Sequence, residues 1–295
     1  MPINQRRITY VLSVHKYSKF NLLTCNFKSQ LYRGRLHQLP SLSHLMLAST
    51  NTNVSIMITI VVIALYFGIA LGYTSTQDDE RIIFLLPKVE LHAHLHGSIR
   101  LPTLVELAKQ QSIAMDHIDT TQVNLEVGFK LFDIVHRVIS RLEILRRLFS
   151  EVVHDYMAEN TMYLELRTTP RSLVDGTTAE QYVRELVEMT VRHNEAHGDR
   201  MLIRLILSID RGKPFIQAAD ILRIAITSKR THNSPIIGLD FSGNPFGVSF
   251  SEFVHLFQQA RDEGLKVTVH TAEIGDLAVN ALTNEDETAS ILKFR

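Results

Sequence analysis

From residue 82 onward the hydrophobic positions follow two periods in turn. Short apolar runs that are typical of strands alternate with longer stretches in which apolar residues recur every three or four positions, as in amphipathic helices. Strands are expected at residues 88–95, 162–168, 203–210, 236–242 and 266–271. Helices are expected near residues 101–111, 126–160, 179–197, 215–229 and 250–263.

Strands that alternate with helices predict an α/β protein with a parallel sheet. Both a doubly wound sheet and a (β/α)8 TIM-type barrel fit this pattern, and the near-continuously apolar run at 203–210 suits either. The sequence lacks the glycine-rich phosphate loops that nucleotide-binding doubly wound sheets carry. Polar residues crowd the carboxyl ends of the expected strands instead, which is where a barrel places its chemistry.

A different pattern precedes residue 82. Residues 54–72 form an uncharged apolar run that is long enough to cross a bilayer as a helix. Basic residues before it and Asp78, Asp79 and Glu80 after it would keep the N-terminus cytoplasmic, as in a single-pass membrane protein. If translation began at Met57, the apolar run would resemble a secretory signal segment that lacks the basic residues usually found at its start. The third interpretation is translated upstream sequence that the folded domain does not need.

Composition narrows the possible partners and chemistry. The 295 residues contain 31 basic and 31 acidic side chains, so the overall charge gives no reason to expect a nucleic-acid partner. Residues 1–53 contain basic side chains and no acidic one, and form a leader without a recognisable domain. The single cysteine, Cys25, lies in that leader. A metal bound by residues 82–295 must therefore be held by nitrogen and oxygen ligands.

Histidines mark the ends of the first and fifth expected strands. His92 and His94 flank Ala93, and side chains two apart on a strand project from the same face. A metal site is one interpretation of this pair, and surface or core histidines are the other. His270 ends the fifth strand and Glu273 follows three residues later. Neutral imidazoles bind zinc, and a nearby carboxylate can move protons, although Glu273 can equally be a solvated loop residue.

Two further strand ends are candidates for binding. The fourth strand continues into Gly243, and glycine there either forms a turn or lets a ligand approach the backbone closely. The second strand runs into RTTPR, Arg167 to Arg171, where two hydroxyl groups stand between two guanidinium groups. This composition suits a phosphate, and it also suits a capped loop with solvated arginines.

Five segments, in this order and spacing, resemble the adenosine deaminase superfamily, most closely the adenosine deaminase-like branch whose members are N6-methyl-AMP deaminases. They are KVELHAHLHGSIR, YLELRTTPR, SIDR, GLDFSGNP and VHTAE. The resemblance covers about residues 82–295 and implies a barrel of the metal-dependent hydrolase kind, of which this chain holds about five of eight strands. It also implies a monomer in the cytosol.

The resemblance assigns roles to individual residues. His92, His94 and His270 would bind one Zn2+, and Glu273 would give a proton to the purine ring. Substrate contacts would come from His94, His96, His136, Thr168, Thr169, Pro170, Arg171, Asp210 and the backbone N–H of Gly243. His96 departs from the family, which usually carries Asp or Asn there, yet an imidazole can still hydrogen-bond to ribose. The RTTPR run favours a nucleoside monophosphate over a nucleoside.

The implied reaction is hydrolytic deamination at C6 of a purine, either N6-methyl-AMP to IMP and methylamine or an adenosine-type deamination. A cytidine deaminase type of zinc site is excluded because it needs a Cys-x-x-Cys pair. The Arg-x-Gly-His and paired-aspartate strands of the family do not follow Glu273, so we expect a poor deaminase from this chain alone. One alternative is a non-catalytic relative, membrane-tethered or free, that binds a purine nucleotide or a partner chain. Another is a zinc hydrolase with a different substrate.

Overall fold

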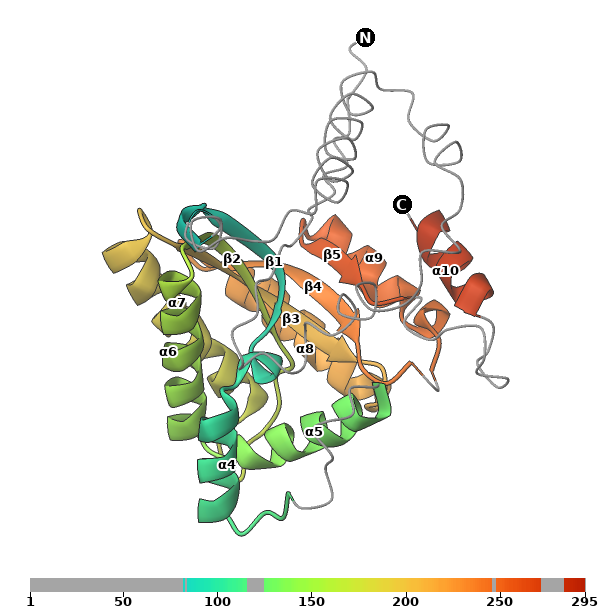
Figure 1. Cartoon of the computed structure of the whole chain (residues 1–295). Helices are drawn as coiled ribbons and strands as arrows, with labels where there is room; N and C mark the ends of the chain where they lie inside the picture. The colour runs from blue at the N-terminus through green and yellow to red at the C-terminus, as the bar shows by residue number, and fades with distance from the viewer. Residues whose placement is uncertain (1–81, 83, 116–124, 246–247, 272–283, 295) are drawn as a thin grey trace, which may run out of the picture. The chain divides into compact units, whose positions relative to one another are not determined.

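The computed structural model describes residues 82, 84–115, 125–245, 248–271 and 284–294 (Figure 1). The unit that carries the sheet begins at Pro87, and the residues just before it, up to Leu86, belong to a separate unit. In that separate unit a single helical turn is described, in which the N–H of Leu86 donates to the carbonyl of Ile82 at 3.0 Å. The basic leader and Cys25 lie outside the described residues.

Five parallel strands form the centre of the unit. They are β1 (Lys88–His94), β2 (Thr161–Thr168), β3 (Leu202–Asp210), β4 (Ile236–Ser242) and β5 (Lys266–Val269). Their order in the sheet is β1-β2-β3-β4-β5, the same as in the sequence. All five expected strands are confirmed, with ends that differ from the expectation by at most two residues.

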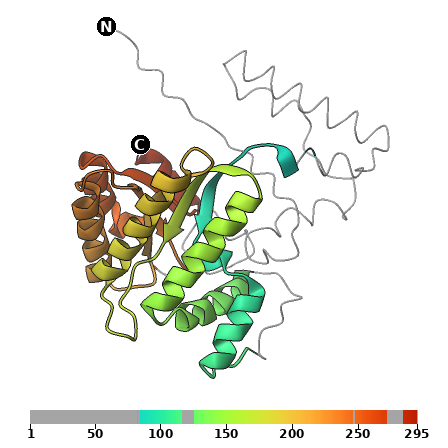
Figure 2. The same cartoon turned by 90° about the vertical axis from the view of Figure 1, so that its left-hand side faces the viewer.

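Seven α-helices and two short 3-10 helices are described with these strands. They are α4 (Leu101–Gln110), α5 (Leu125–Val138), α6 (Leu142–Ala158), α7 (Ala179–His197), α8 (Phe215–Lys229), α9 (Val254–Asp262), α10 (Asn284–Lys293), η2 (His96–Ser98) and η3 (Phe250–Glu252). Helices α6 to α9 cover one face of the sheet (Figures 1 and 2). Successive parallel strands are joined by right-handed crossovers. Because these crossovers all advance in the same direction across the sheet, every helix lies on the same face. The sequential strand order therefore identifies part of a (β/α) barrel and not a doubly wound sheet, whose order reverses.

The helix expected near 126–160 is two helices, because the chain breaks at residues 139–141. The carbonyl of Ser140 accepts the N–H of Val174 at 2.8 Å, and the N–H of Leu142 donates to Asp175 Oδ2 at 2.7 Å. Both groups are thus bonded to the loop after β2 and not to the preceding helical turn. The apolar spacing continues across the break, so the sequence pattern gave no sign of it.

The two faces of the sheet differ sharply in polarity. On the helix-covered face, Ile203, Leu207 and Ile209 of β3 are at most 1% exposed. On the opposite face Ser208, Asp240 and Thr268 are register partners on β3, β4 and β5, and they form a polar row across the sheet. A closed or partly closed barrel holds such groups on its inner face, where they are available for binding and catalysis.

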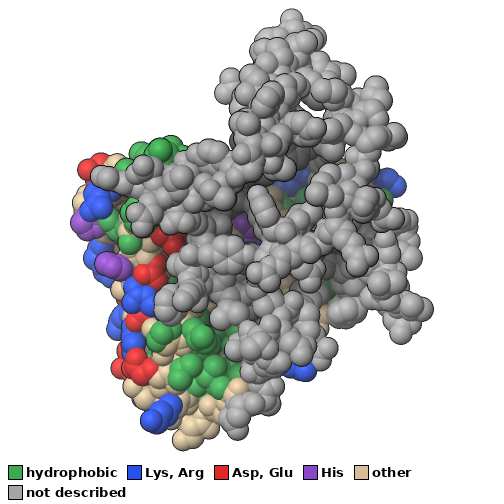
Figure 3. All heavy atoms as spheres, in the orientation of Figure 1, with side chains coloured by type: hydrophobic (Ala, Val, Ile, Leu, Met, Phe, Trp, Pro, Cys, Tyr) green, Lys and Arg blue, Asp and Glu red, His purple; other side chains and the backbone are tan. Residues whose placement is uncertain are grey.

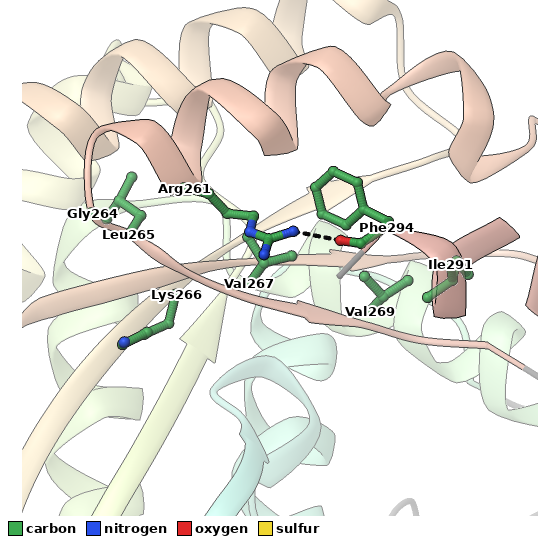
Figure 4. A pocket seen from close by; sticks show the side chains of 8 residues that line it. All are labelled: Arg261, Gly264, Leu265, Lys266, Val267, Val269, Ile291 and Phe294. Carbon is green, nitrogen blue, oxygen red and sulfur yellow. Dashed lines mark hydrogen bonds between the residues drawn. The ribbon is translucent and has the colours of Figure 1, made fainter. Parts of the chain in front are cut away.

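Helix α10 packs near the edge of the sheet that β5 forms. A pocket lies between α9, β5 and α10, and Val267, Val269, Ile291 and Phe294 contribute to its wall (Figure 4). Arg261 of α9 donates to the carbonyl of Phe294, and its guanidinium lies 4.9 Å from the centre of the Phe294 ring. This contact fastens the end of α10 to α9.

Acidic and basic side chains intermix on the side of the molecule that holds α6 and α7 (Figure 3). Arg146 of α6 pairs with Glu185 of α7 at 2.8 Å, and Arg192 lies 3.9 Å from Glu188 one turn earlier on α7. Exposed pairs of this kind contribute at most about 1 kcal/mol each. The solvent face therefore adds solubility more than stability, and the fold depends on its core.

The expected membrane association is corrected by the structure. No helix within the described ranges is long and apolar enough to cross a membrane, so the transmembrane helix and the single-pass or secretory route are withdrawn. Residues 54–72, on which that expectation rests, lie outside the described residues.

Replacing Gly238 tests the register between β4 and β5. A Cβ added there would lie 2.6 Å from the backbone oxygen of Lys266, so the two strands would have to move apart. We expect Gly238→Ala to lower the free energy of unfolding by about 1–3 kcal/mol, as overpacking does. The measurement is urea unfolding of the full chain.

The matched control is Gly128→Ala in α5, where an added Cβ meets no atom within 4 Å. Alanine is the better helix former, so this variant should gain roughly 0.5–1 kcal/mol. Equal stability of Gly238→Ala and the wild-type chain would contradict the register.

Candidate metal centre and neighbouring pocket

Three histidines converge although they come from the two outer strands of the sheet. His92 and His94 belong to β1, and His270 directly follows β5. Four strand spacings separate β1 from β5 in a flat sheet, about 19 Å. The Nε2 atoms nevertheless lie 2.9 Å apart for His92 and His270, 3.1 Å for His94 and His270, and 3.3 Å for His92 and His94. The sheet is therefore curled into a half-barrel that brings its outer strands together.

The spacing of the three nitrogens fits a tetrahedral metal ion. Zinc-to-nitrogen bonds of about 2.0–2.1 Å at tetrahedral angles place two ligand nitrogens about 3.3 Å apart. The three ligand atoms also lie within 4.8 Å of one another. The prediction that His92 and His94 project from the same face is confirmed in this geometry, even though β1 is irregular between Glu90 and Ala93.

Burial and nearby charges keep the rings of His92 and His94 neutral, which is the form that binds a metal. Desolvation, together with the charges of Arg167 and His270, lowers the pKa of His92 to about 4. Burial lowers the pKa of His94 to about 3. At pH 7 both imidazoles therefore have a lone pair available.

His270 is held in one orientation by β4. Its Nδ1 lies 3.1 Å from the carbonyl of Phe241 and 3.1 Å from Oδ1 of Asp240. Both neighbours are acceptors, so Nδ1 carries a proton, and in the neutral ring Nε2 is the unprotonated nitrogen, facing His92 and His94. An acceptor behind a histidine ligand fixes its tautomer in this way in many metal sites.

Asp240 is the centre of a buried polar network. Its carboxylate accepts hydrogen bonds from Arg167 Nη1 at 2.9 Å, Thr268 Oγ1 at 2.7 Å and Ser208 Oγ at 3.0 Å. Burial alone would raise the pKa of Asp240, but the hydrogen bond from His270 and the charges of His270 and Arg167 outweigh it and lower the pKa. The carboxylate therefore stays ionised behind His270.

The same arginine reaches β1. Arg167 Nη2 donates to the carbonyl of Leu91 at 2.8 Å, and the backbone oxygen of Arg167 accepts the N–H of Leu95 at 2.8 Å. Sequence reasoning assigned no role to Asp240 or to the Arg167 contact with it. The available signal was a charged residue between Leu239 and Phe241, because an acid in a buried strand is costly unless it is paired.

A second cluster lies on the other side of Leu95. His96 is buried, and its Nε2 lies 3.1 Å from the hydroxyl of Tyr182 and 3.3 Å from Nη1 of Arg171. Burial, and then the charge of Arg171, lower the pKa of His96 well below its ordinary value, so the ring is a neutral acceptor. Tyr182 also exchanges a 2.6 Å hydrogen bond with Thr168. Sequence reasoning missed Tyr182, since nothing in a helical pattern distinguishes it from a core tyrosine.

Arg171 closes this cluster against helix α5. Its Nη2 donates to the carbonyls of His136 at 2.9 Å and Ile139 at 3.1 Å, where the helix ends. The rings of His136 and His96 are 4.9 Å apart, and burial followed by the charge of Arg171 lowers the pKa of His136 to about 4. The structure thus brings together candidate residues from three segments of the sequence: His96, His136, and Thr168 with Arg171 of the RTTPR run.

The remaining candidates occupy nearby strand ends. Thr169 is half-buried and Pro170 is buried, between Thr168 and Arg171. Gly243 has a φ of +100°, and a Cβ there would lie 2.1 Å from Asp210 Oδ1, so only glycine fits beside that carboxylate. Asp210 Oδ1 also accepts the N–H of Gly212 at 2.9 Å. Glu273 lies outside the described residues.

Known proteins resemble this chain over the region that carries both clusters. The adenosine deaminase family profile matches residues 87–283. An N6-mAMP deaminase of Arabidopsis thaliana is 34% identical over 218 residues, covering 64% of this chain and 61% of the relative. The human N6-methyl-AMP deaminase is 31% identical over 197 residues, covering 64% of this chain and 55% of the relative.

A solved structure gives the same result for the fold. The crystal structure of Arabidopsis ADAL complexed with IMP is 32% identical, with a TM-score of 0.62 over 72% of this chain and 64% of that one. This chain therefore spans 55–64% of the length of these three proteins. The half-barrel, the histidine cluster and the match over residues 87–283 agree, and the chain belongs to the adenosine deaminase family.

Proposed function

We propose that this chain carries the metal-binding part of a zinc-dependent deaminase that converts N6-methyl-AMP to IMP and methylamine. The observation that carries the proposal is the convergence of three histidine Nε2 atoms within 3.3 Å of one another. The relatives named N6-methyl-AMP deaminase and the relative that was solved with IMP support the choice of substrate.

His92, His94 and His270 would hold the metal ion through Nε2. Imidazole nitrogens suit zinc, and catalytic zinc commonly has three protein ligands and one open position. Zinc bound there would act as a Lewis acid that makes water a nucleophile at neutral pH. The ionised Asp240 keeps His270 in the tautomer that such binding needs.

Proton transfer would fall to Glu273, three residues beyond His270 in the sequence. In the proposed reaction the oxygen of water bonds to C6 of the purine and the bond from C6 to the methylamine nitrogen breaks. Glu273 would give a proton to a purine ring nitrogen as the water adds, and methylamine would leave with a proton. AMP itself would react in the same way, with ammonia leaving in place of methylamine.

The cluster around Arg171 would receive the nucleotide's phosphate. The guanidinium is half-buried, and its described hydrogen bonds use three of its five N–H donors, on His96, His136 and Ile139. A fixed cation that retains donors suits a phosphate better than an uncharged ribose hydroxyl. This arrangement favours a nucleoside monophosphate as the substrate.

Removing a proposed ligand should remove the metal. We expect about one zinc per chain in the wild-type protein and less than roughly 0.2 in His92→Ala, His94→Ala or His270→Ala, because each change deletes one of few ligands. Zinc content after dialysis would be measured by atomic absorption. His197→Ala at the end of α7 is the matched control and should keep its zinc. A ligand variant that retained full occupancy would rule that residue out.

The lowered histidine pKa values also predict the pH dependence of folding. The pKa of His94 is about 3 in the folded chain and near 6.5 when unfolded, so the unfolded chain binds more protons below about pH 6.5. Stability of the metal-free chain should therefore fall as pH falls from 7 toward 4.5. Thermal unfolding at stepped pH would check this.

His94→Gln removes one of the groups with a lowered pKa and should make the pH dependence shallower, with His197→Gln at the exposed end of α7 as the matched control. A wild-type midpoint that does not change with pH would contradict the neutral assignment.

Arg171 should distinguish nucleotide from nucleoside. Arg171→Gln is expected to weaken IMP binding about 10-fold and to change inosine binding less than about 2-fold, since a hydrogen bond to a charged group is worth roughly 1.5–3 kcal/mol. Titration calorimetry with both ligands is the measurement. The control is Arg137→Gln, which removes an exposed positive charge from the neighbouring turn of α5. Equal losses for IMP and inosine would place the phosphate elsewhere.

A further inference from the structure

Arg211 is a buried cation that the chemistry proposed above does not use. It directly follows β3, is 2% exposed, and its backbone N–H donates to the carbonyl of Ser242 at 2.9 Å. Burying a guanidinium is costly unless it is paired and hydrogen-bonded. Its partners therefore show what this arginine stabilises.

Two groups take up the donors of this guanidinium. Nη1 lies 3.2 Å from each carboxylate oxygen of Glu287 on α10, and Nη2 donates to the backbone carbonyl of His270 at 3.2 Å. The guanidinium also lies 4.5 Å from the centre of the Phe241 ring, while Nε has no partner among the described residues. The arginine thus joins α10 to a histidine of the metal cluster.

The contact with His270 lies just beyond the end of the sheet. Strand β5 ends at Val269, and its last register pair with β4 is Phe241 with Val269. The N–H of His270 still donates to the carbonyl of Phe241 at 2.8 Å, but the carbonyl of His270 lies beyond the ladder. Arg211 supplies a donor to this carbonyl. The backbone of His270 is therefore held from both sides.

Glu287 makes this arrangement possible. It neutralises Arg211, and its Oε1 also accepts the backbone N–H of Phe250 at 2.8 Å, at the start of η3. One carboxylate thus connects α10, η3 and the end of β3. Without it the guanidinium would be a buried, unpaired charge, and its contact with His270 would be weakened.

We propose that Arg211 and Glu287 form a positioning pair that sets the backbone of His270 for metal binding. The proposal rests on the metal site described above, and neither residue touches the metal position. Hydrogen-bonded groups behind a metal ligand typically change metal affinity 10–100-fold when they are removed.

Lysine at position 211 would keep the charge but not the geometry. A single ammonium group cannot present two separated planar donors to Glu287 and to the carbonyl of His270. We expect Arg211→Lys to raise the Kd for zinc at least about 10-fold. Glu287→Gln keeps the shape of the side chain and one acceptor oxygen but removes the negative charge. It should also raise the Kd for zinc, by about 3-fold.

The matched control is Arg261→Lys. Arg261 also fastens α10, through the carbonyl of Phe294, but it contacts neither His270 nor Glu287 in its described interactions. Loosening α10 alone should therefore change the Kd for zinc by less than about 2-fold. The Kd values would come from competition with a chromophoric chelator on the full chain. The visible absorption of bound Co2+ would report the ligand geometry independently of affinity.

The outcomes separate the two proposals. Absence of stoichiometric metal in the wild-type chain would overturn the proposed metal site itself. A wild-type chain that binds metal, with Arg211→Lys and Glu287→Gln within 2-fold of it and an unchanged Co2+ spectrum, would overturn the positioning role. Equal weakening by Arg261→Lys would also overturn it. If Arg211→Lys does not unfold cooperatively, Glu287→Gln decides by the same criteria.

Discussion

The burial of one ionised carboxylate, that of Asp240, constrains most of the candidate site. An acid in the middle of a strand is stable there only if hydrogen-bond donors surround it. The donors come from three other strands or their ends: Arg167 on β2, Ser208 on β3, and Thr268 and His270 on and after β5. Loss of any of them would weaken the compensation of a buried charge. The network therefore specifies the relative register of β2 to β5 more strongly than the apolar face can.

The metal cluster and the Arg171 cluster are mechanically connected through β1 and β2. His94 and His96 flank Leu95, whose N–H donates to the carbonyl of Arg167 at 2.8 Å. Arg167 faces the metal cluster through Asp240, and the same strand ends at Thr168, which contacts Tyr182 in the other cluster. The two sites are thus held at a fixed separation by adjacent strands. This arrangement suits a ligand that carries its reacting ring at one end and an anionic group at the other.

The parts of this picture that depend on local pattern could be predicted from the sequence. Alternation along the chain predicted the five strands, and the spacing of His92 and His94 predicted a shared face. Features that depend on distant partners could not be predicted. The break before Leu142 depends on Asp175, and the role of Arg211 depends on Glu287, which lies 76 positions later. His96 could be predicted only in part. The sequence showed that it departs from the family pattern, but not that it contacts Tyr182.

His270 is joined to α10 through Arg211, and Thr271 contacts α10 directly, which has a consequence for how this part of the sequence can vary in length. Arg211 contacts both His270 and Glu287, and the hydroxyls of Thr271 and Thr288 lie 2.9 Å apart. The two ends of the intervening segment are therefore fixed beside each other, whatever that segment contains. The entropy cost of closing a loop grows only with the logarithm of its length, about 0.6 kcal/mol for each doubling. Insertions or deletions between these anchors, beyond Glu273, can accumulate while the positions of His270 and α10 remain unchanged.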